Sequence, residues 1–441
     1  MRHKRFGDNR GVALPLALMA FVVLGALSAA LLAVGSSEVQ IASNHLRGTQ
    51  AFFLAEAGLE HTFNRVNVLW NTSRASLPTN AAYPPQPVPG IEANTPLGGA
   101  GNYTVQYQAA GLWTWRVVST GVSAIGGSQQ IRRAVMSTFY QSRNAIVANG
   151  DLTIGGSSFV SATNGQCGNV HSNGDLTLGG NTTILGYAAE ADNGDPNDAD
   201  PVQVNGGSVN VTGGIRDHAP TEPLPHIDPA GFLADLKTNP MGMGAPPLDH
   251  LIQMKANGEV LDGSDALITT LADNGSYCGW TYTSGTPLAQ WTFNDNTVLP
   301  DCNGTYYLEG NATVVGSPGS DATPWKTTLI ATGDIDIQGK PTIQADANYT
   351  VSDTLFYSGR DIEINGTPSN GYNGVIAAHE QFYLHGNGTF TGFIVGENAP
   401  NTVGSLVNAN NNIVSGNIGL TYKCDANPPL QGPLRFLSWG L

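Results

Sequence analysis

The longest apolar run of the chain lies close to its N-terminus. Residues 12–34 carry no charge, whereas Arg2, Lys4, Arg5 and Arg10 all precede the run. A helix over these residues would be roughly 34 Å long at 1.5 Å per residue, enough to cross a bilayer core of about 30 Å. Because the basic residues lie on one flank, that end is predicted to stay in the cytoplasm. The pattern predicts one membrane-spanning segment, with the rest of the chain outside.

The helical pattern continues beyond this run without a break. Apolar residues recur at spacings of three and four in the order Phe52, Ala55, Leu59, Phe63, Val66 and Trp70. A secretory signal has an apolar core of about 7–15 residues and would not be joined to a second amphipathic helix. The sequence predicts one helix from about residue 12 to residue 70, apolar all round in its first half and two-faced in its second. An ordinary signal-anchor followed by a juxtamembrane helix is the alternative.

The character of the chain changes after residue 70. Residues 71–101 contain five prolines between residues 78 and 89 and are predicted to form a loop. Alternating apolar residues then predict short strands over residues 103–107, 113–117 and 131–140. We expect these strands to form a small antiparallel sheet.

From about residue 144 a repeat dominates the sequence. Residues 149–156, NGDLTIGG, return at residues 173–180 as NGDLTLGG, and looser copies lie at residues 204–214, 305–316, 332–339, 359–366 and 381–388. Neighbouring copies are spaced by roughly 20–27 residues, a period typical of solenoids. Short alternating strands with Gly or Asn corners favour a parallel β-helix, and a β-sandwich is the alternative. The predicted fold class is therefore α+β to mainly β.

The repeat is interrupted over about residues 215–300. Asp228 and Pro229 form a helix start, with an N-cap residue followed by proline at the first helical position. Residues 248–258 and 264–275 carry a similar helical spacing of apolar residues. We expect a partly helical insertion that forms a lid or a side domain on the solenoid.

The N-terminal segment resembles a known family. RGVALPLALMAF followed by AFFLAEAGLEH (residues 51–61) is similar to type IV pilin-like proteins, specifically PilX-like minor pilins and K-type pseudopilins. The resemblance covers about the first 70 residues. It implies that a prepilin peptidase cuts after Gly11 and that the new N-terminal residue, Val12, is methylated. It also implies that the helix packs against other subunits in a filament, through Leu16, Gly25, Phe52, Leu59 and Phe63.

One departure from the family concerns Leu16. Most pilins have a glutamate at this fifth mature position, which is thought to neutralise the N-terminal ammonium of a neighbouring subunit. A buried ammonium without a partner is costly. A subunit without the glutamate therefore suits a filament position with no subunit above it, namely the tip.

Composition narrows the partners. The chain has 441 residues and a formal net charge of −15, which argues against nucleic acid as a ligand. Its four cysteines, Cys167, Cys278, Cys302 and Cys424, lie beyond the membrane segment and are compatible with two disulfides in an oxidising compartment. Three pairings can be drawn, of which Cys278 with Cys302 is the local one. No CxxC spacing supports a zinc or redox site.

The chain carries no recognised catalytic motif: GxSxG, HExxH, a P-loop and a dinucleotide fingerprint are all missing from the sequence. Asp334 and Asp336 are expected on one face of a strand, and Asp361 with Glu363 repeats the spacing one coil later. Stacked, the four could form an acidic ladder suited to glycoside chemistry or calcium. A solvent-exposed polar face explains them equally, and His379 and His385 are interpreted as loop histidines. We expect no enzyme.

One segment has the composition of a cation site. Asp192, Asp195, Asp198 and Asp200 lie in DNGDPNDAD and offer the hard oxygen ligands that Ca²⁺ prefers. The segment lacks the twelve-residue EF-hand layout, and a solvated acidic turn is the alternative. No other cofactor is expected.

Together these features predict a minor pilin with a leader (residues 1–11), a pilin helix (12–70), a small sheet (71–143) and an exposed solenoid (144–441). It would reside in the bacterial inner membrane and then in an extracellular filament. The expected partners are other pilins, the assembly machinery, the prepilin peptidase and a surface glycan or protein. The alternatives are an anchored β-helix enzyme acting on polysaccharide and a K-type pseudopilin of type II secretion. So large a solenoid would crowd a tightly packed shaft, which favours the tip and a role in assembly and adhesion.

Overall fold

The structure is a computed structural model. It describes residues 13–72, 77, 86–92, 94–111, 114–125, 128–140, 142–163, 168–191, 202–238, 248–285, 287–366, 371–407, 411–423 and 430–440. The chain divides into two compact units. The first unit comprises Met1–Ala110, Trp115–Met136 and Phe436–Leu441, and the second comprises Gly111–Thr114 and Ser137–Arg435.

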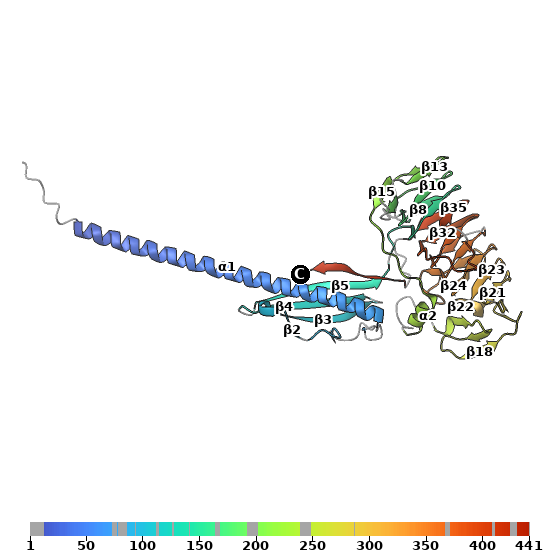
Figure 1. Ribbon diagram of the computed structural model, residues 1–441, viewed down its shortest axis with the longest axis horizontal. Coiled ribbons are helices and arrows are strands. Elements are labelled where there is room, and N and C mark those ends of the chain that lie inside the picture. The colour runs from blue at the N-terminus through green and yellow to red at the C-terminus, as the bar shows by residue number, and fades with distance from the viewer. Residues whose placement is uncertain are drawn as a thin grey trace, which may run out of the picture. The chain divides into compact units, whose positions relative to one another are not determined.

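A single helix dominates the first unit. Helix α1 spans Ala13–Thr72 without interruption (Figure 1). By length and composition it is long and apolar enough to cross a membrane. The predicted continuous helix is therefore confirmed.

The rest of the first unit is a small antiparallel sheet. Its strand order is β1-β3-β4-β5-β36, and β2 also pairs with β3. The strands are β1 (Gln86–Pro87), β2 (Thr95–Pro96), β3 (Gly101–Gly111), β4 (Thr114–Ser123), β5 (Gln129–Phe139) and β36 (Gln431–Gly440), with a 3₁₀ turn η3 (Gly98–Ala100) before β3. The three predicted strands are present. The pairing of β36, from the C-terminal end of the chain, was not predicted.

The second half of α1 buries one stripe of residues. Its members are mostly small or aliphatic: Ala51, Leu54, Ala55, Gly58, Leu59, Thr62, Val66 and Leu69. Phe52 and Phe63, which belong to the predicted apolar face, are only partly buried. The buried stripe is therefore rotated around the helix relative to the predicted apolar face. Its small residues let the helix backbone approach the sheet. A Cβ on Gly121 of β4, for instance, would lie 2.1 Å from the carbonyl oxygen of Ala51.

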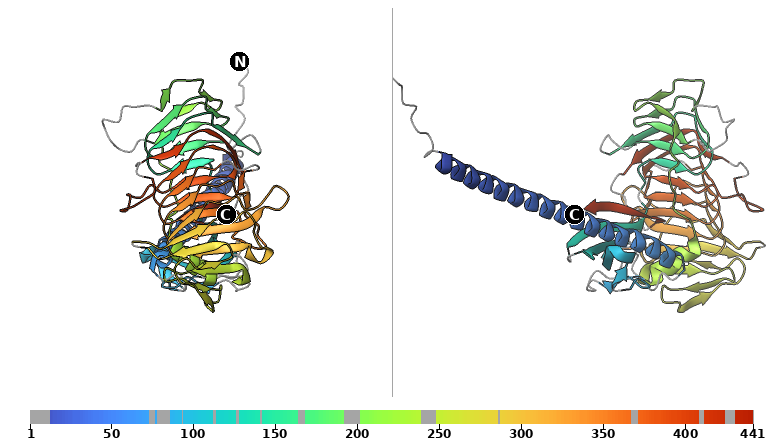
Figure 2. Two further views of the ribbon diagram at one scale, coloured as in Figure 1. Left: turned by 90° about the vertical axis from the view of Figure 1, so that its right-hand side faces the viewer. Right: turned by 60° about the vertical axis from the view of Figure 1, so that its left-hand side comes forward.

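The second unit is a β-solenoid whose stacked coils form three ladders of parallel strands (Figure 2). The first ladder contains, in spatial order, β15 (Ile215–Ala219), β12 (Ala188–Ala191), β9 (Val170–Ser172), β6 (Ile146–Ala148), β33 (Ile394–Gly396), β30 (Val375–Ala378), β27 (Thr354–Ser358), β24 (Trp325–Ala331), β22 (Gly304–Leu308) and β16 (Leu251–Met254).

The second ladder runs through β13 (Gln203–Asn205), β10 (Leu176–Gly179), β7 (Leu152–Ile154), β34 (Asn412–Val414), β31 (Phe382–Leu384), β28 (Ile362–Ile364), β25 (Ile335–Ile337), β23 (Asn311–Val314) and β21 (Gln290–Phe293). The third runs through β14 (Asn210–Val211), β11 (Thr183–Ile184), β8 (Phe159–Ala162), β35 (Asn417–Tyr422), β32 (Asn387–Gly392), β29 (Tyr372–Asn373) and β26 (Ile343–Gln344). The predicted parallel β-helix is confirmed.

The coils do not stack in sequence order. The first coil, with β6, β7 and β8, pairs on one side with the second coil and on the other side with the last, which contains β33, β34 and β35. The chain winds outward from the middle of the stack to β15, crosses to the far end at β16, and then coils back to its starting point. In Figure 2 the red C-terminal coils accordingly lie next to the teal first coils.

The ladders differ in what covers them. Strands of the second ladder alternate buried and partly exposed residues, as in β25 and β28. Strands of the first ladder, such as β27 and β30, are buried at every position. Helix α2 (Pro229–Thr238) covers part of this ladder, and Phe232 stacks on Tyr357 with ring centroids 4.5 Å apart. Continuous burial explains why these strands lack alternation.

The interruption is less helical than predicted. Helix α2 forms where expected, but residues 248–258 contain only a 3₁₀ turn, η4 (Leu248–His250), before β16 and β17 (Glu259–Leu261), and residues 264–275 contain β18 (Leu267–Thr270). Strand β16 pairs in parallel with β22, while β17 and β18 form a hairpin. The helix predictions for these two segments were wrong because a stacking position in the ladder outweighs a short helical spacing. Next to β21, the second ladder ends in two antiparallel strands: β20 (Trp280–Thr283) pairs with β21, and β19 (Ser276–Tyr277) pairs with β20.

Candidate functional site

The first half of α1 presents an apolar surface that the described part of the chain does not cover. Residues 14–42 are all exposed, among them Phe21 at 76% and Leu16 at 61%. A Cβ placed on Gly25 would have no described atom within 4 Å. Contiguous exposed apolar surface of this extent marks a site of contact with lipid or with other proteins. Gly11 and Val12 lie outside the described residues.

Residues 55–58 (AEAG), part of the AFFLAEAGLEH segment, lie where α1 meets the sheet of its own unit. A Cβ on Gly58 would lie 2.2 Å from Ser119 Oγ and 2.9 Å from Tyr103 Cδ2, so only glycine permits this approach. Nearby, Arg132 forms an ion pair of 3.2 Å with Glu56, and its guanidinium lies 4.7 Å from the Phe52 ring centroid. Of the predicted filament-packing residues, Leu59 is buried against the sheet, which leaves Leu16 and Gly25 on the uncovered stem.

The predicted acidic ladder is divided by the fold. Asp336 and Glu363 are register partners on neighbouring strands of the second ladder and lie partly exposed. Asp334 and Asp361 directly precede these strands and are buried, at 5% and 0% exposed. The expectation that all four share one face was wrong, because Asp334 and Asp361 lie at the bend before each strand, outside the alternation of β25 and β28.

The two buried carboxylates belong to a polar cluster that holds a loop. Asp361 accepts hydrogen bonds from the backbone N–H groups of Gln381 (2.9 Å) and Val407 (2.7 Å). Glu380, also fully buried, accepts the N–H of Thr402 at 3.0 Å. Arg360 lies 3.7 Å from Asp334. Burial raises the pKa of the Asp361 carboxyl to about 7. These contacts fasten residues 398–407 to the coils, so the cluster is structural.

The two histidines singled out in the sequence both contact carboxylates. His385 Nε2 lies 2.7 Å from Glu363 Oε1, and its ring stacks on Tyr383 with centroids 4.2 Å apart. His379 Nδ1 lies 2.6 Å from Glu397 Oε2. Their interpretation as isolated loop histidines was incomplete, because the partners come from other coils and no sequence spacing reveals them.

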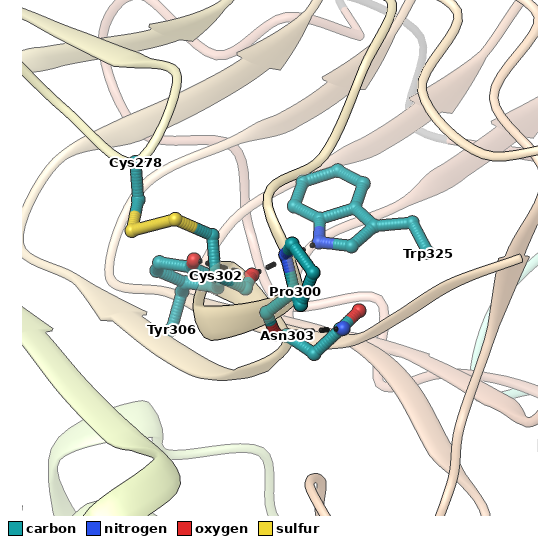
Figure 3. Close-up of a disulfide and its surroundings, with 6 residues drawn as sticks. All are labelled: Cys278, Pro300, Cys302, Asn303, Tyr306 and Trp325. Carbon is teal, nitrogen blue, oxygen red and sulfur yellow. Dashed lines mark hydrogen bonds between the residues drawn. A yellow bond between two sulfur atoms is a disulfide. The ribbon is translucent and has the colours of Figure 1, made fainter.

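A disulfide lies at the end of the solenoid that contains β16 and β21. Cys278 and Cys302 are bonded, which is the local pairing, and Cys302 lies in a 3₁₀ turn, η5 (Pro300–Cys302). Figure 3 shows the Cys302 carbonyl accepting hydrogen bonds from Tyr306 Oη (2.7 Å) and Trp325 Nε1 (3.3 Å). The bond therefore anchors β19 and β20 to the coils. Cys167 and Cys424 lie outside the described residues.

Next to this disulfide lies an open hollow of about 680 Å³. Trp325 and Pro300 supply apolar lining, and Asn303 and Lys326 supply polar lining. Lys326 Nζ lies 2.7 Å from Asp346 Oδ2 and 4.8 Å from the centroid of Tyr349, which also lines the hollow. Trp325 is only 1% exposed, so the Tyr349 ring, the Asn303 amide and the Lys326–Asp346 ion pair are the groups open to a ligand. No motif in the sequence pointed to this hollow.

Asp192, Asp195, Asp198 and Asp200 all lie outside the described residues.

No protein-family model and no curated protein matches the chain. Among solved structures, it is similar to the competence-associated pilin ComZ from Thermus thermophilus, with 15% identity over 89% of this chain and 97% of that chain and a TM-score of 0.31. It is also similar to an ice binding protein from an Antarctic biological consortium, with 10% identity over 64% of this chain and 87% of that chain and a TM-score of 0.26. At these TM-scores neither likeness bears on function.

Proposed function

We propose that this chain is a subunit of a type IV pilus-like filament that displays the solenoid outside the cell. The observation that carries the proposal is α1, one helix of 60 residues whose first half is exposed and apolar while its second half packs on the sheet of its own unit. A plain anchor needs only about 20 apolar residues. Rigid continuation into a folded unit suits subunits whose helices pack side by side.

Such a helix serves the subunit in two environments. The exposed apolar stretch satisfies the bilayer before assembly, and the same stretch packs against other apolar helices after assembly. The expected partners are accordingly other pilin-like subunits, their assembly machinery and a prepilin peptidase acting between Gly11 and Val12. The resemblance of the AFFLAEAGLEH segment to PilX-like minor pilins supports this assignment.

Within the filament we assign the subunit to the tip or to the priming complex. Leu16 replaces the carboxylate that would neutralise the ammonium of a neighbouring subunit, and an unpaired buried ammonium is unfavourable. The solenoid is also the larger of the two units. Both features suit a position above which no further subunit packs.

The proposed role of the solenoid is binding at a surface. The hollow beside Trp325, with Lys326 and Tyr349, supports a polar ligand such as a glycan. An enzyme acting on polysaccharide is the second candidate, which the neighbouring side chains of Asp336 and Glu363 favour. Full adhesion and assembly in an Asp336→Ala/Glu363→Ala variant would remove that candidate.

Shearing tests the assignment to a filament. We expect the processed chain in the sheared filament fraction of wild-type cells, and a longer form confined to membranes when Gly11 is replaced by Val. A wild-type chain that stays wholly in the membrane fraction while filaments are sheared off would contradict the proposal. Lost protein export with filaments intact would favour a K-type pseudopilin instead.

A further inference from the structure

Two histidines and a glutamate converge on the surface of the solenoid. His226, His379 and Glu397 place one candidate ligand atom each within 4.8 Å of one another. His226 Nδ1 lies 2.7 Å from Glu397 Oε1, and His379 Nδ1 lies 2.6 Å from Glu397 Oε2. The centroids of the two imidazole rings are 5.7 Å apart. We propose that these three side chains bind one divalent transition-metal ion of the Zn²⁺ class.

The ligand set has the chemistry of such a site. Two imidazole nitrogens and one carboxylate oxygen are ligands of Zn²⁺, with bonds of about 2.0–2.2 Å, and leave a fourth position for water or a ligand. Hard cations such as Ca²⁺ prefer sets made only of oxygen. Bonds of this length place tetrahedral ligand atoms about 3.4 Å apart, so small side-chain rotations complete the site.

The backbone already positions two of the ligands. The N–H of His379 donates to the carbonyl of Ser358 at 3.0 Å, and the N–H of Glu397 donates to the carbonyl of Ala378 at 2.9 Å. Both residues directly follow strands of the first ladder, β30 and β33. They are 29% and 21% exposed at the side chain, which is open enough for an ion to enter.

The third ligand comes from the segment that crosses the first ladder. His226 is 73% exposed at its side chain, so it contributes little to the core. Its neighbour Ile227 donates its N–H to Glu397 Oε2 at 2.9 Å, and the N–H of Asp228 donates to Tyr357 Oη at 2.9 Å. An ion on these ligands would therefore fasten the crossing segment to coils about 170 residues later in the chain.

The chain contains a matched pair that lacks the second histidine. His385 and Glu363 are in contact at 2.7 Å and are 22% and 21% exposed at the side chain, close to the values of His379 and Glu397. Of the described residues, only the group at Glu397 combines two histidines with a carboxylate in this arrangement. His385→Gln is therefore the control for any general effect of losing a histidine next to a glutamate.

Calorimetry with Zn²⁺ tests the site on the full chain, purified in detergent without a histidine tag and stripped with EDTA. We expect one ion per chain, at least tenfold weaker binding in His226→Ala and His379→Gln, and unchanged binding in His385→Gln. Because His226 is exposed, its replacement leaves the fold intact. Co²⁺ should give visible absorption bands of tetrahedral coordination that vanish in His226→Ala. Absent binding, or His226→Ala binding as the wild type does, would overturn the proposal.

Discussion

Replacing Gly58 by valine should destabilise the packing of α1 on its sheet. A Cβ at this position would lie 2.2 Å from Ser119 Oγ, 2.9 Å from Tyr103 Cδ2 and 3.1 Å from Val105 Cγ2. The first two contacts are shorter than real Cβ atoms tolerate, the third is tight, and the two Cγ atoms of valine add further overlap. Overpacking of a buried contact costs about 1–3 kcal/mol, whereas the gain in helix propensity over glycine is only about 0.4 kcal/mol.

The net expected loss is about 1.6 kcal/mol in the local stability of the first unit, which corresponds to roughly 15-fold faster amide exchange. Hydrogen exchange of peptides from β3 and β4 measures this loss directly, whereas global unfolding would mix in the solenoid. Gly48→Val, in the same helix, is the matched control, because a Cβ added there would meet no described atom within 4 Å. Equal protection in the two variants would refute the packing argument.

Three further predictions concern the disulfide, a buried acid and the stem. Replacing Cys278 and Cys302 by serine should lower the free energy of unfolding by about 3.5 kcal/mol in urea titrations, from loop closure over a sequence separation of 24; a loss below about 1 kcal/mol would contradict it. Burial raises the pKa of Asp361 from 3.8 to about 7, so its contribution to stability is fully present below about pH 4 and is lost as the pH rises from about 4 to about 7. This amounts to about 4 kcal/mol, which Asp361→Asn should remove from the pH profile; an unchanged profile would refute it. Leu16→Glu should admit the subunit to the shaft, and labelling still confined to one end would argue against the role given to that position.

The repeat made the solenoid predictable, but it did not predict the stacking order. Residues 149–156 and 173–180 have the same pattern, and their strands β7 and β10 pair with Leu152 opposite Leu176. Coils of this kind offer similar edges on both sides. Nothing local distinguishes stacking on the next coil from stacking on the last one, so the pairing of β7 with β34 had no sequence signal.

Prediction of the candidate sites was limited for the same reason, because the sequence does not show which distant segments the stacking brings together. Glu363 and Asp336 could be predicted as neighbours because they occupy equal positions in consecutive repeats. His226 and Glu397 are separated by 171 residues and meet only because the chain crosses the first ladder after β15. Strand β16 illustrates a different error, in which a strand was predicted as a helix. Its sequence LIQM is too short for its apolar pattern to distinguish a helix turn from a buried strand.

Imaging of sheared filaments with gold-labelled antibodies to residues 144–441 tests the central claim most directly. The account predicts label at one end of the filaments, because in the proposed assignment the stem of α1 inserts among other subunits and Leu16 suits only the tip. Filaments that carry no label, from cells that produce the processed chain, would contradict membership of the filament. Label along the whole shaft would contradict the assignment to the tip.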